Sequence, residues 1–110
     1  MEAGLLIPRN FVLDPSAKEG IQECLDVLDH TKVWIPAICW LATLVGSGDS
    51  EIEREGPGIA AYEADQAPKG AVRNVDGIDL IFALTPQNRV FFDNKTLHFE
   101  RGRGFFLLDI

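Results

Sequence analysis

Hydrophobic residues recur at helical spacing in one early segment, residues 15–29, and charged or amide side chains occupy its other side. Asp14 can cap this helix with Pro15 at the first helical position. Alternatively, Ser16 and Glu19 form a capping box. We therefore predict one main N-terminal helix over 15–29. Its apolar positions are Ala17, Ile21, Cys24, Leu25 and Leu28.

The longest apolar run, Val33 to Val45, has no polar side at either spacing. Its β-branched and aromatic content favours a strand that is covered on both faces. Pro36 near one end and Gly46 at the other would equally suit a short buried helix. We predict a strand, with Pro36 at an edge or a bulge.

Most of the remaining chain reads as short strands separated by turns. Asp76-Gly77 is a favoured two-residue hairpin turn, and the even-numbered residues from Ile78 to Leu84 alternate onto one face. Thr85 followed by Pro86 predicts one or two helical turns over 86–92. Residues 46–58 form a long polar loop in this interpretation. The predicted strands are 5–7, 11–13, 59–65, 71–75, 78–84, 96–100 and 105–109.

This order of elements predicts a single α+β domain over residues 1–110. We expect a mostly antiparallel β-sheet, or a small partly closed barrel, beside the one main helix. Both faces of the run 33–45 and of the segment 105–110 are apolar, which is more than a single helix can cover. The sheet therefore closes on itself, or an apolar face is covered by a second copy of the chain.

The net charge of −7 argues against general binding to nucleic acid or to an anionic membrane. No apolar run reaches the roughly 20 residues of a membrane-spanning helix, and no signal peptide is expected at the start. The two cysteines, Cys24 and Cys39, do not form a Cys-x-x-Cys or Cys-x-x-x-Cys pair. We therefore expect two buried free thiols in a reducing compartment. We expect a cytoplasmic protein without a cofactor.

Two segments, from Phe11 to Leu28 and from Val75 to Phe106, resemble the HesB-like, A-type iron–sulfur carriers in their order of elements. The resemblance implies the same fold. In that family three cysteines bind the cluster, one in a central loop and two in a C-terminal Cys-x-Cys. The corresponding loop here, 46–58, contains no cysteine, and Ile110 precedes the position of the pair. Because clusters need thiolate ligands, the resemblance does not carry the activity over.

Candidate sites for metal or acid–base chemistry are few. His30 at the helix end and His98 on a strand could ligate a metal together, although a helix cap and a surface histidine are the simpler interpretation. Asp76 is a residue of the hairpin turn and Asp79 is expected to point outward, so the two suggest no acid–base pair. The acidic residues of the loop could offer oxygen ligands to Ca²⁺ or Mg²⁺, but they lack the alternating ligand pattern of a calcium-binding loop. A solvated loop is the simpler interpretation. The acidic residues of this loop are Asp49, Glu51, Glu53 and Glu55.

Aromatic residues suggest a different kind of site. Trp34 and Trp40 share one strand parity and would lie on the same face. With Tyr62 and Phe82 they could line a concave pocket for a small molecule or a peptide, and ordinary core packing is the alternative. Arg101 and Arg103 form the one concentrated basic spot and could contact an anion.

We therefore expect a non-catalytic binding or interaction domain that forms a homodimer through an apolar sheet face. One alternative is an iron–sulfur or metal accessory protein in which Cys39 and a histidine replace the missing cysteines. Another is a small enzyme whose site forms across a dimer interface with His30 or His98.

Overall fold

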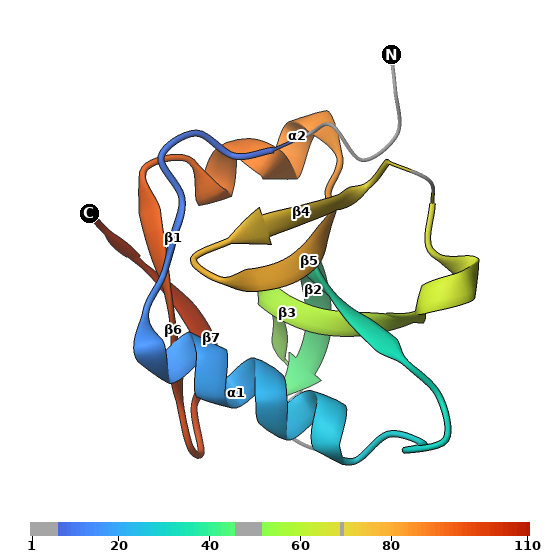
Figure 1. Cartoon of the computed structure of the whole chain (residues 1–110). Coiled ribbons are helices and arrows are strands. Elements are labelled where there is room, and N and C mark those ends of the chain that lie inside the picture. Colours follow the sequence, from blue (N-terminus) through green and yellow to red (C-terminus); the bar gives the residue numbers. More distant parts are fainter. Residues whose placement is uncertain (1–6, 46–51, 69) are drawn as a thin grey trace.

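The computed structural model describes residues 7–45, 52–68 and 70–110 and shows an α+β fold with two separate sheets (Figure 1). We name the sheet with strand order β1-β6-β7 the small sheet, and the sheet with order β3-β2-β5-β4 the large sheet. The strands are β1 (Val12–Leu13), β2 (Trp34–Val45), β3 (Ile52–Glu63), β4 (Val72–Val75), β5 (Ile78–Ala83), β6 (Lys95–Glu100) and β7 (Gly104–Asp109). The helices are α1 (Pro15–Asp26), η2 (Ala64–Gln66), α2 (Pro86–Arg89) and η3 (Val90–Phe92).

The predicted α+β class is confirmed, and the two sheets do not close into a barrel. Within the described residues, β2–β3, β4–β5 and β6–β7 pair antiparallel. β1 pairs with β6, and β2 with β5, in parallel. The parallel pairs join segments that are far apart in the sequence, so both sheets are mixed.

Helix α1 follows the predicted pattern but ends at Asp26, three residues before the predicted end at residue 29. Its cap is Asp14, whose carboxylate accepts a hydrogen bond from the Ser16 backbone N–H at 2.9 Å. The hydroxyl of Ser16 is used elsewhere, because it accepts the N–H of Phe99 in β6 at 3.0 Å. The first of the two predicted caps is therefore the one observed, and Ser16 joins the helix to the small sheet.

The run 33–45 is a strand, β2, as predicted. Pro36 pairs with Ala61 of β3 and lies just before Ala37, where the parallel pairing with β5 begins. A missing N–H is tolerated there because no neighbouring strand needs it.

The predicted polar loop over 46–58 is wrong in its second half, because residues 52–58 belong to β3 and pair with β2. Alternation is hard to recognise there because Gly56, Pro57 and Gly58 interrupt it. Residues 46–51 of the predicted loop lie outside the described residues. Residues 5 and 6 of the predicted strand 5–7 do so too, and Ile7 is not in a strand.

The predicted hairpin joins β4 to β5, with Asp76 at φ 50° and Gly77 at φ 90°. Both values fit the turn that matches the twist of paired strands. The Asp76 carboxylate also accepts the backbone N–H of Leu13 at 2.9 Å. This turn residue therefore ties the large sheet to β1 of the small sheet, a tertiary role that the sequence did not suggest.

The main core lies between the two sheets and α1. The even-numbered residues of β5 point into it, as predicted, and Thr85 and Asn88 form a capping box that begins α2. α2 and η3 then bring Phe92 into the core. The buried members of this cluster are Leu13, Ala17, Ile21, Ile38, Leu80, Phe82, Leu84, Phe92 and Leu97.

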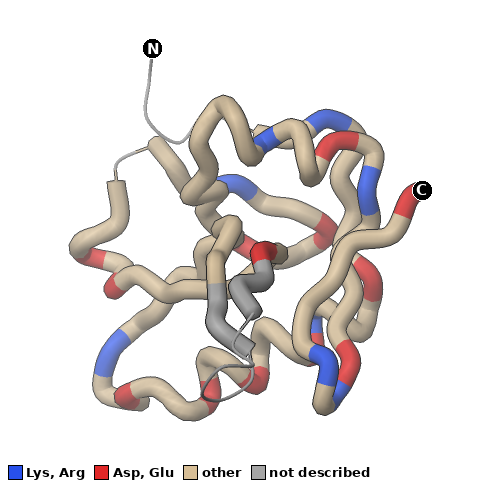
Figure 2. Tube along the Cα trace, turned by 180° about the vertical axis from the view of Figure 1, so that it is seen from behind, with Lys and Arg blue, Asp and Glu red and all other residues tan. Residues whose placement is uncertain are grey.

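None of the described helices is both long and apolar enough to cross a bilayer. Lysine and arginine residues are spread around the described part of the molecule rather than gathered on one side (Figure 2).

Candidate functional site

The outer face of the small sheet, directed away from the core, carries exposed apolar side chains. Val12 is 38% exposed, Leu108 47% and Ile110 62%. Val12 and Leu108 both pair with Thr96, so they flank it in one row across the three strands. Phe106 lies in the next row of the same face, because strand side chains alternate. We call Val12, Phe106, Leu108 and Ile110 the outer apolar face.

One end of the outer apolar face is polar. His98 stacks on Phe106 with ring centroids 5.4 Å apart, and its Nδ1 lies 3.5 Å from the Asp14 carboxylate. The guanidinium of Arg103 lies over the Phe106 ring at 3.8 Å. Hydrogen bonds from Ser16, and to a smaller extent the charge of His98, lower the pKa of Asp14. A lowered pKa favours the charged form of this carboxylate at the polar end of the outer apolar face.

This His98–Asp14 pair is not a nucleophilic site of the usual kind. Catalysis by a serine needs the hydroxyl beside the histidine, with the acid behind it. Here Asp14 receives hydrogen bonds from Ser16 and lies next to His98, so the acid occupies the middle position. The arrangement caps a helix and orients a surface histidine.

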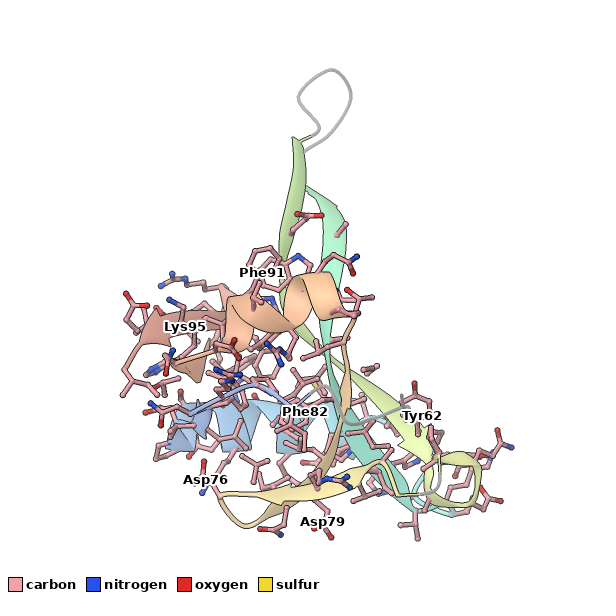
Figure 3. The ribbon with its side chains drawn as sticks, turned by 90° about the horizontal axis from the view of Figure 1, so that it is seen from above. Tyr62, Asp76, Asp79, Phe82, Phe91 and Lys95 are labelled. Carbon is pink, nitrogen blue, oxygen red and sulfur yellow. The ribbon has the colours of Figure 1, made fainter. Side chains whose placement is uncertain are left out.

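A groove of about 870 Å³ lies between the hairpin of β2 and β3 and the hairpin of β6 and β7. We call it the Trp40 groove. Trp40 stacks on Phe91 of η3 at 4.6 Å and meets Phe92 edge-on at 5.7 Å, which holds its ring in place. The ends of β2 and β3 project beyond the rest of the ribbon (Figure 3). The lining residues are Trp40, Leu41, Glu55, Gly56, Pro57 and Gly102–Leu107.

Of the four residues predicted to line a ligand pocket, only Trp40 lines this groove. Phe82 is 2% exposed and belongs to the main core. Tyr62 pairs with Ile35 and packs with it on the opposite side of the large sheet, in a small cluster around Ala37. Figure 3 places Phe82 near the middle of the molecule and Tyr62 toward the end of β3. Thus Trp40 and Phe82 share a core, and Tyr62 is separated from both by the sheet.

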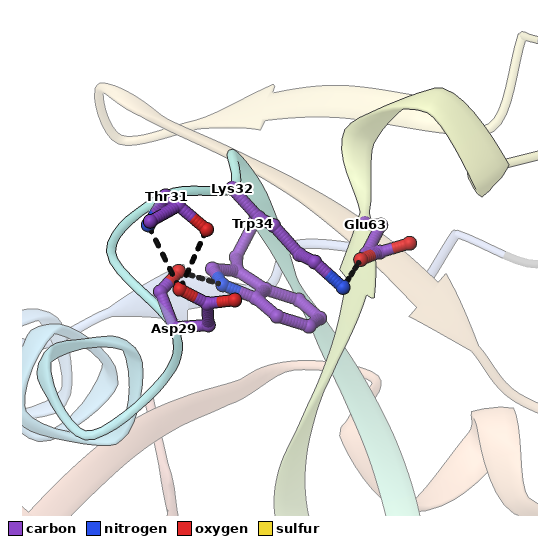
Figure 4. A network of polar contacts seen from close by, with 5 residues as sticks. All are labelled: Asp29, Thr31, Lys32, Trp34 and Glu63. Carbon is purple, nitrogen blue, oxygen red and sulfur yellow. Dashed lines mark hydrogen bonds and ion pairs between the residues drawn. The ribbon is translucent and has the colours of Figure 1, made fainter.

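Trp34 has a structural contact that accounts for its position (Figure 4). Its indole N–H donates to the Asp29 carbonyl at 2.9 Å, in the turn that joins α1 to β2. The hydroxyl and the backbone N–H of Thr31 donate to the Asp29 carboxylate, and these bonds lower the pKa of Asp29. Lys32 pairs with Glu63 at 2.6 Å beside them, which raises the pKa of the lysine. The network fixes the entry into β2.

The two predicted anion contacts lie in one hairpin turn but face different surroundings. Arg101 forms an ion pair with Glu23 of α1. Arg103 lines the Trp40 groove and covers Phe106, and its pairing with Glu100 is long, at 4.0 Å. Its side chain is 59% exposed. Arg103 is therefore the arginine of the pair that could meet a ligand in the groove.

The remaining candidates are dispersed. His30 lies after α1, with its Nε2 2.8 Å from the Asp26 carbonyl, and not beside His98. Among the described residues, no group of three or more His, Cys, Asp or Glu side chains could hold a metal ion. Glu53 and Glu55 lie in β3, while Asp49 and Glu51 lie outside the described residues.

Both cysteines are free and half-buried, and burial raises the pKa of each thiol. A raised pKa keeps a thiol protonated at neutral pH, and a protonated thiol is a poor nucleophile. Cys39 donates to the Gly58 carbonyl at 3.5 Å across β2 and β3. The predicted free thiols are thus observed, but they are half-buried rather than buried.

The sequence interpretation missed the contribution of Pro57 and the two glycines beside it. The predicted loop over 46–58 includes the Gly-Pro-Gly run, whereas the structure places this run in β3, where it forms one wall of the Trp40 groove. A proline within a strand is confined to an edge or a bulge, so Pro57 is compatible with an edge strand.

Comparison of the chain with models of protein families, with curated proteins and with solved structures found no match.

Proposed function

We propose that this chain is a non-catalytic interaction domain that self-associates through the outer apolar face. The observation that carries the proposal is the exposure of Val12, Leu108 and Ile110 on one side of a small sheet whose other side is buried. Large apolar side chains that gather on one surface mark contact sites more often than single exposed ones do.

A twofold contact is the simplest way to cover this face. It places the same apolar residues of two copies against one another, and side chains from facing sheets pack about 10 Å apart. The charged groups Asp14 and Arg103 lie at one end of the face, where they can remain at the rim. We therefore favour a homodimer with an apolar centre.

The dimer is expected to be weak. Two strands of six residues and one of two span at most roughly 14 by 20 Å. That area is well below the approximately 800 Å² per partner of a standard interface. We expect a dissociation constant in the micromolar range or above, with a folded monomer at low concentration. We also place the domain in the cytoplasm, because its two thiols are unpaired.

Sedimentation equilibrium tests the proposal directly. The wild-type chain should shift from monomer to dimer as its concentration rises from micromolar to millimolar. Leu108→Asp should remain monomeric, because it would bury a carboxylate in an apolar contact. Val27→Asp is the matched control, since Val27 is 83% exposed beyond the end of α1. A wild type that stays monomeric throughout, or two variants that behave alike, would reject this interface.

A further inference from the structure

The edge of β7 that faces away from β6 carries backbone groups directed into the Trp40 groove. The N–H of Phe99 donates to the Ser16 hydroxyl at 3.0 Å, and the C=O of Leu97 accepts the Asp14 N–H at 3.0 Å. Both bonds lie on the side of β6 that faces away from β7, so Phe99–Phe105 and Leu97–Leu107 are non-bonded pairs of the β6–β7 ladder. Bonded and non-bonded pairs alternate along an antiparallel ladder. The even-numbered residues of β7 therefore bond to β6, while Phe105 and Leu107 direct their N–H and C=O groups toward the groove.

The strand across the groove, β3, does not pair with these groups. Pro57 of β3 has no N–H and pairs with Trp40 of β2. A proline has no N–H to exchange, so it fits only a non-bonded pair of the ladder. Pro36 pairs with Ala61 four positions along the same ladder, and this even spacing gives both prolines the same, non-bonded kind of pair. The nitrogen of Pro57 consequently faces the free edge of β3. A proline there removes one donor and disfavours strand pairing, and β3 and β7 lie in separate sheets.

The side chains around this free edge are suited to an extended ligand. Trp40 offers an apolar surface whose position is fixed by Phe91 and Phe92. Among the described residues that line the groove, Arg103 is the one lysine or arginine, and its charge is partly exposed. Glu55 on the β3 side is the one acidic residue in this described lining. An acidic group is thus favoured near the β6–β7 turn and disfavoured on the opposite wall.

We propose that the Trp40 groove binds an extended peptide segment of a partner protein, which adds as a strand to the free edge of β7. The segment forms backbone hydrogen bonds with Phe105 and Leu107, places an apolar side chain against Trp40 and sets a carboxylate beside Arg103. Strand addition to an exposed sheet edge is a general mode of peptide recognition, in which backbone bonds supply affinity and alternate side chains supply specificity.

Amide hydrogen exchange of the free protein tests the edge assignment without any ligand. The amides of Phe106 and Leu108 should exchange slowly because they bond to β6, whereas those of Phe105 and Leu107 should exchange rapidly. Equal protection of all four amides at low protein concentration would overturn the proposal. Protection of Phe105 and Leu107 that appears only as the concentration rises would mean that a second copy occupies the edge, which also overturns it.

Selection from a phage library of random linear peptides tests the ligand. Enriched peptides should combine alternating apolar residues with an acidic residue, and a synthetic copy should slow exchange at Phe105 and Leu107. Every second backbone nitrogen of the peptide can be methylated, which gives two alternative variants. The variant that methylates the nitrogens facing β7 should bind at least about tenfold more weakly, and the other should bind almost as well as the unmodified peptide. Selection that enriches no sequence over a protein-free control would overturn the proposal.

The two arginines of the turn supply a matched pair of variants. Arg103→Glu should weaken binding of the selected peptide about fivefold or more, while Arg101→Glu should change it less than about twofold. Arg101 lies outside the groove and pairs with α1. Equal effects of the two reversals, or binding without protection at β7, would place the peptide elsewhere. Leu108→Asp, which tests self-association, should leave peptide binding intact, so the two proposals can fail separately.

Discussion

On the inner face of the small sheet Leu97 is 1% exposed, whereas on the outer face Leu108 is 47% exposed. The two leucines lie on neighbouring strands, within one residue of the same row, since Leu97 pairs with Leu107. α1 and the large sheet cover the first face, and the exposed side chains of the second remain available to another molecule. Burial rather than residue type thus separates the leucine that stabilises the fold from the one that we assign to association.

The largest effect is expected from shortening the inner leucine. Leu97→Ala removes a fully buried side chain and should lower the free energy of unfolding by about 2–5 kcal/mol. Leu108→Ala should change it by less than about 0.5 kcal/mol in the monomer. Urea unfolding at micromolar concentration measures both. If the two variants lost similar stability, the distinction between the faces would not hold.

A smaller effect is expected where α1 approaches the inner face. A methyl group at Gly20 would lie 2.7 Å from Cδ1 and 2.9 Å from Cβ of Phe99. Alanine favours a helix over glycine by about 1 kcal/mol, but overpacking costs about 1–3 kcal/mol, so Gly20→Ala should destabilise the fold. Gly58→Ala is the control, because its close neighbour is the exposed side chain of Leu41, which can turn away. Thermal unfolding should show a lower midpoint for the first variant only.

A loss of about 1 kcal/mol is expected at the capping box that begins α2. This helix leads into η3, whose Phe91 and Phe92 contact Trp40. Thr85→Ala removes the hydroxyl that accepts the Asn88 N–H at 3.3 Å. It should cost about 1 kcal/mol of unfolding free energy, and Thr85→Ser should cost less because it keeps the hydroxyl. Tryptophan fluorescence of the folded state should change little in either variant. A large spectral change would mean that α2 positions Trp40 more directly than its contacts indicate.

The smallest effect concerns the polar end of the outer apolar face. The pKa of Asp14 is lowered in the folded protein, so its stabilising contribution is present above the ordinary aspartate pKa of about 3.9. That contribution is lost as the pH falls through the lower folded value. Melting temperatures measured from pH 6 down to pH 3 should fall less steeply for Asp14→Asn than for the wild type. Identical slopes would show that Asp14 adds no pH dependence.

Local signals in the sequence account for much of the fold. Asp14 and Pro15 begin α1, Asp76-Gly77 turns the hairpin, and Thr85 begins α2, as their residue types predict. Each of these features depends on a few neighbouring residues whose backbone preferences act whatever surrounds them. The prediction of a loop is wrong for residues 52–58, because glycines and a proline hide a strand that exists through its pairing with β2.

The candidate site was predictable only in part. The sequence identified Trp40 and Arg103, and it indicated that the apolar residues exceed what one helix covers. It also grouped Trp40 with Tyr62, which the large sheet separates. Parity along one strand shows which side chains share a face, but it does not relate the faces of different strands until their register is known.

Local backbone preference and composition are enough to predict the helix, the turns, the strand alternation and the excess of apolar surface. They do not predict that the strands divide into two sheets, that α1 covers the inner face of the small sheet, or that the edges of β3 and β7 border a groove. Those outcomes depend on parallel pairings between distant segments, such as β1 with β6. Only the packing of the whole chain selects them.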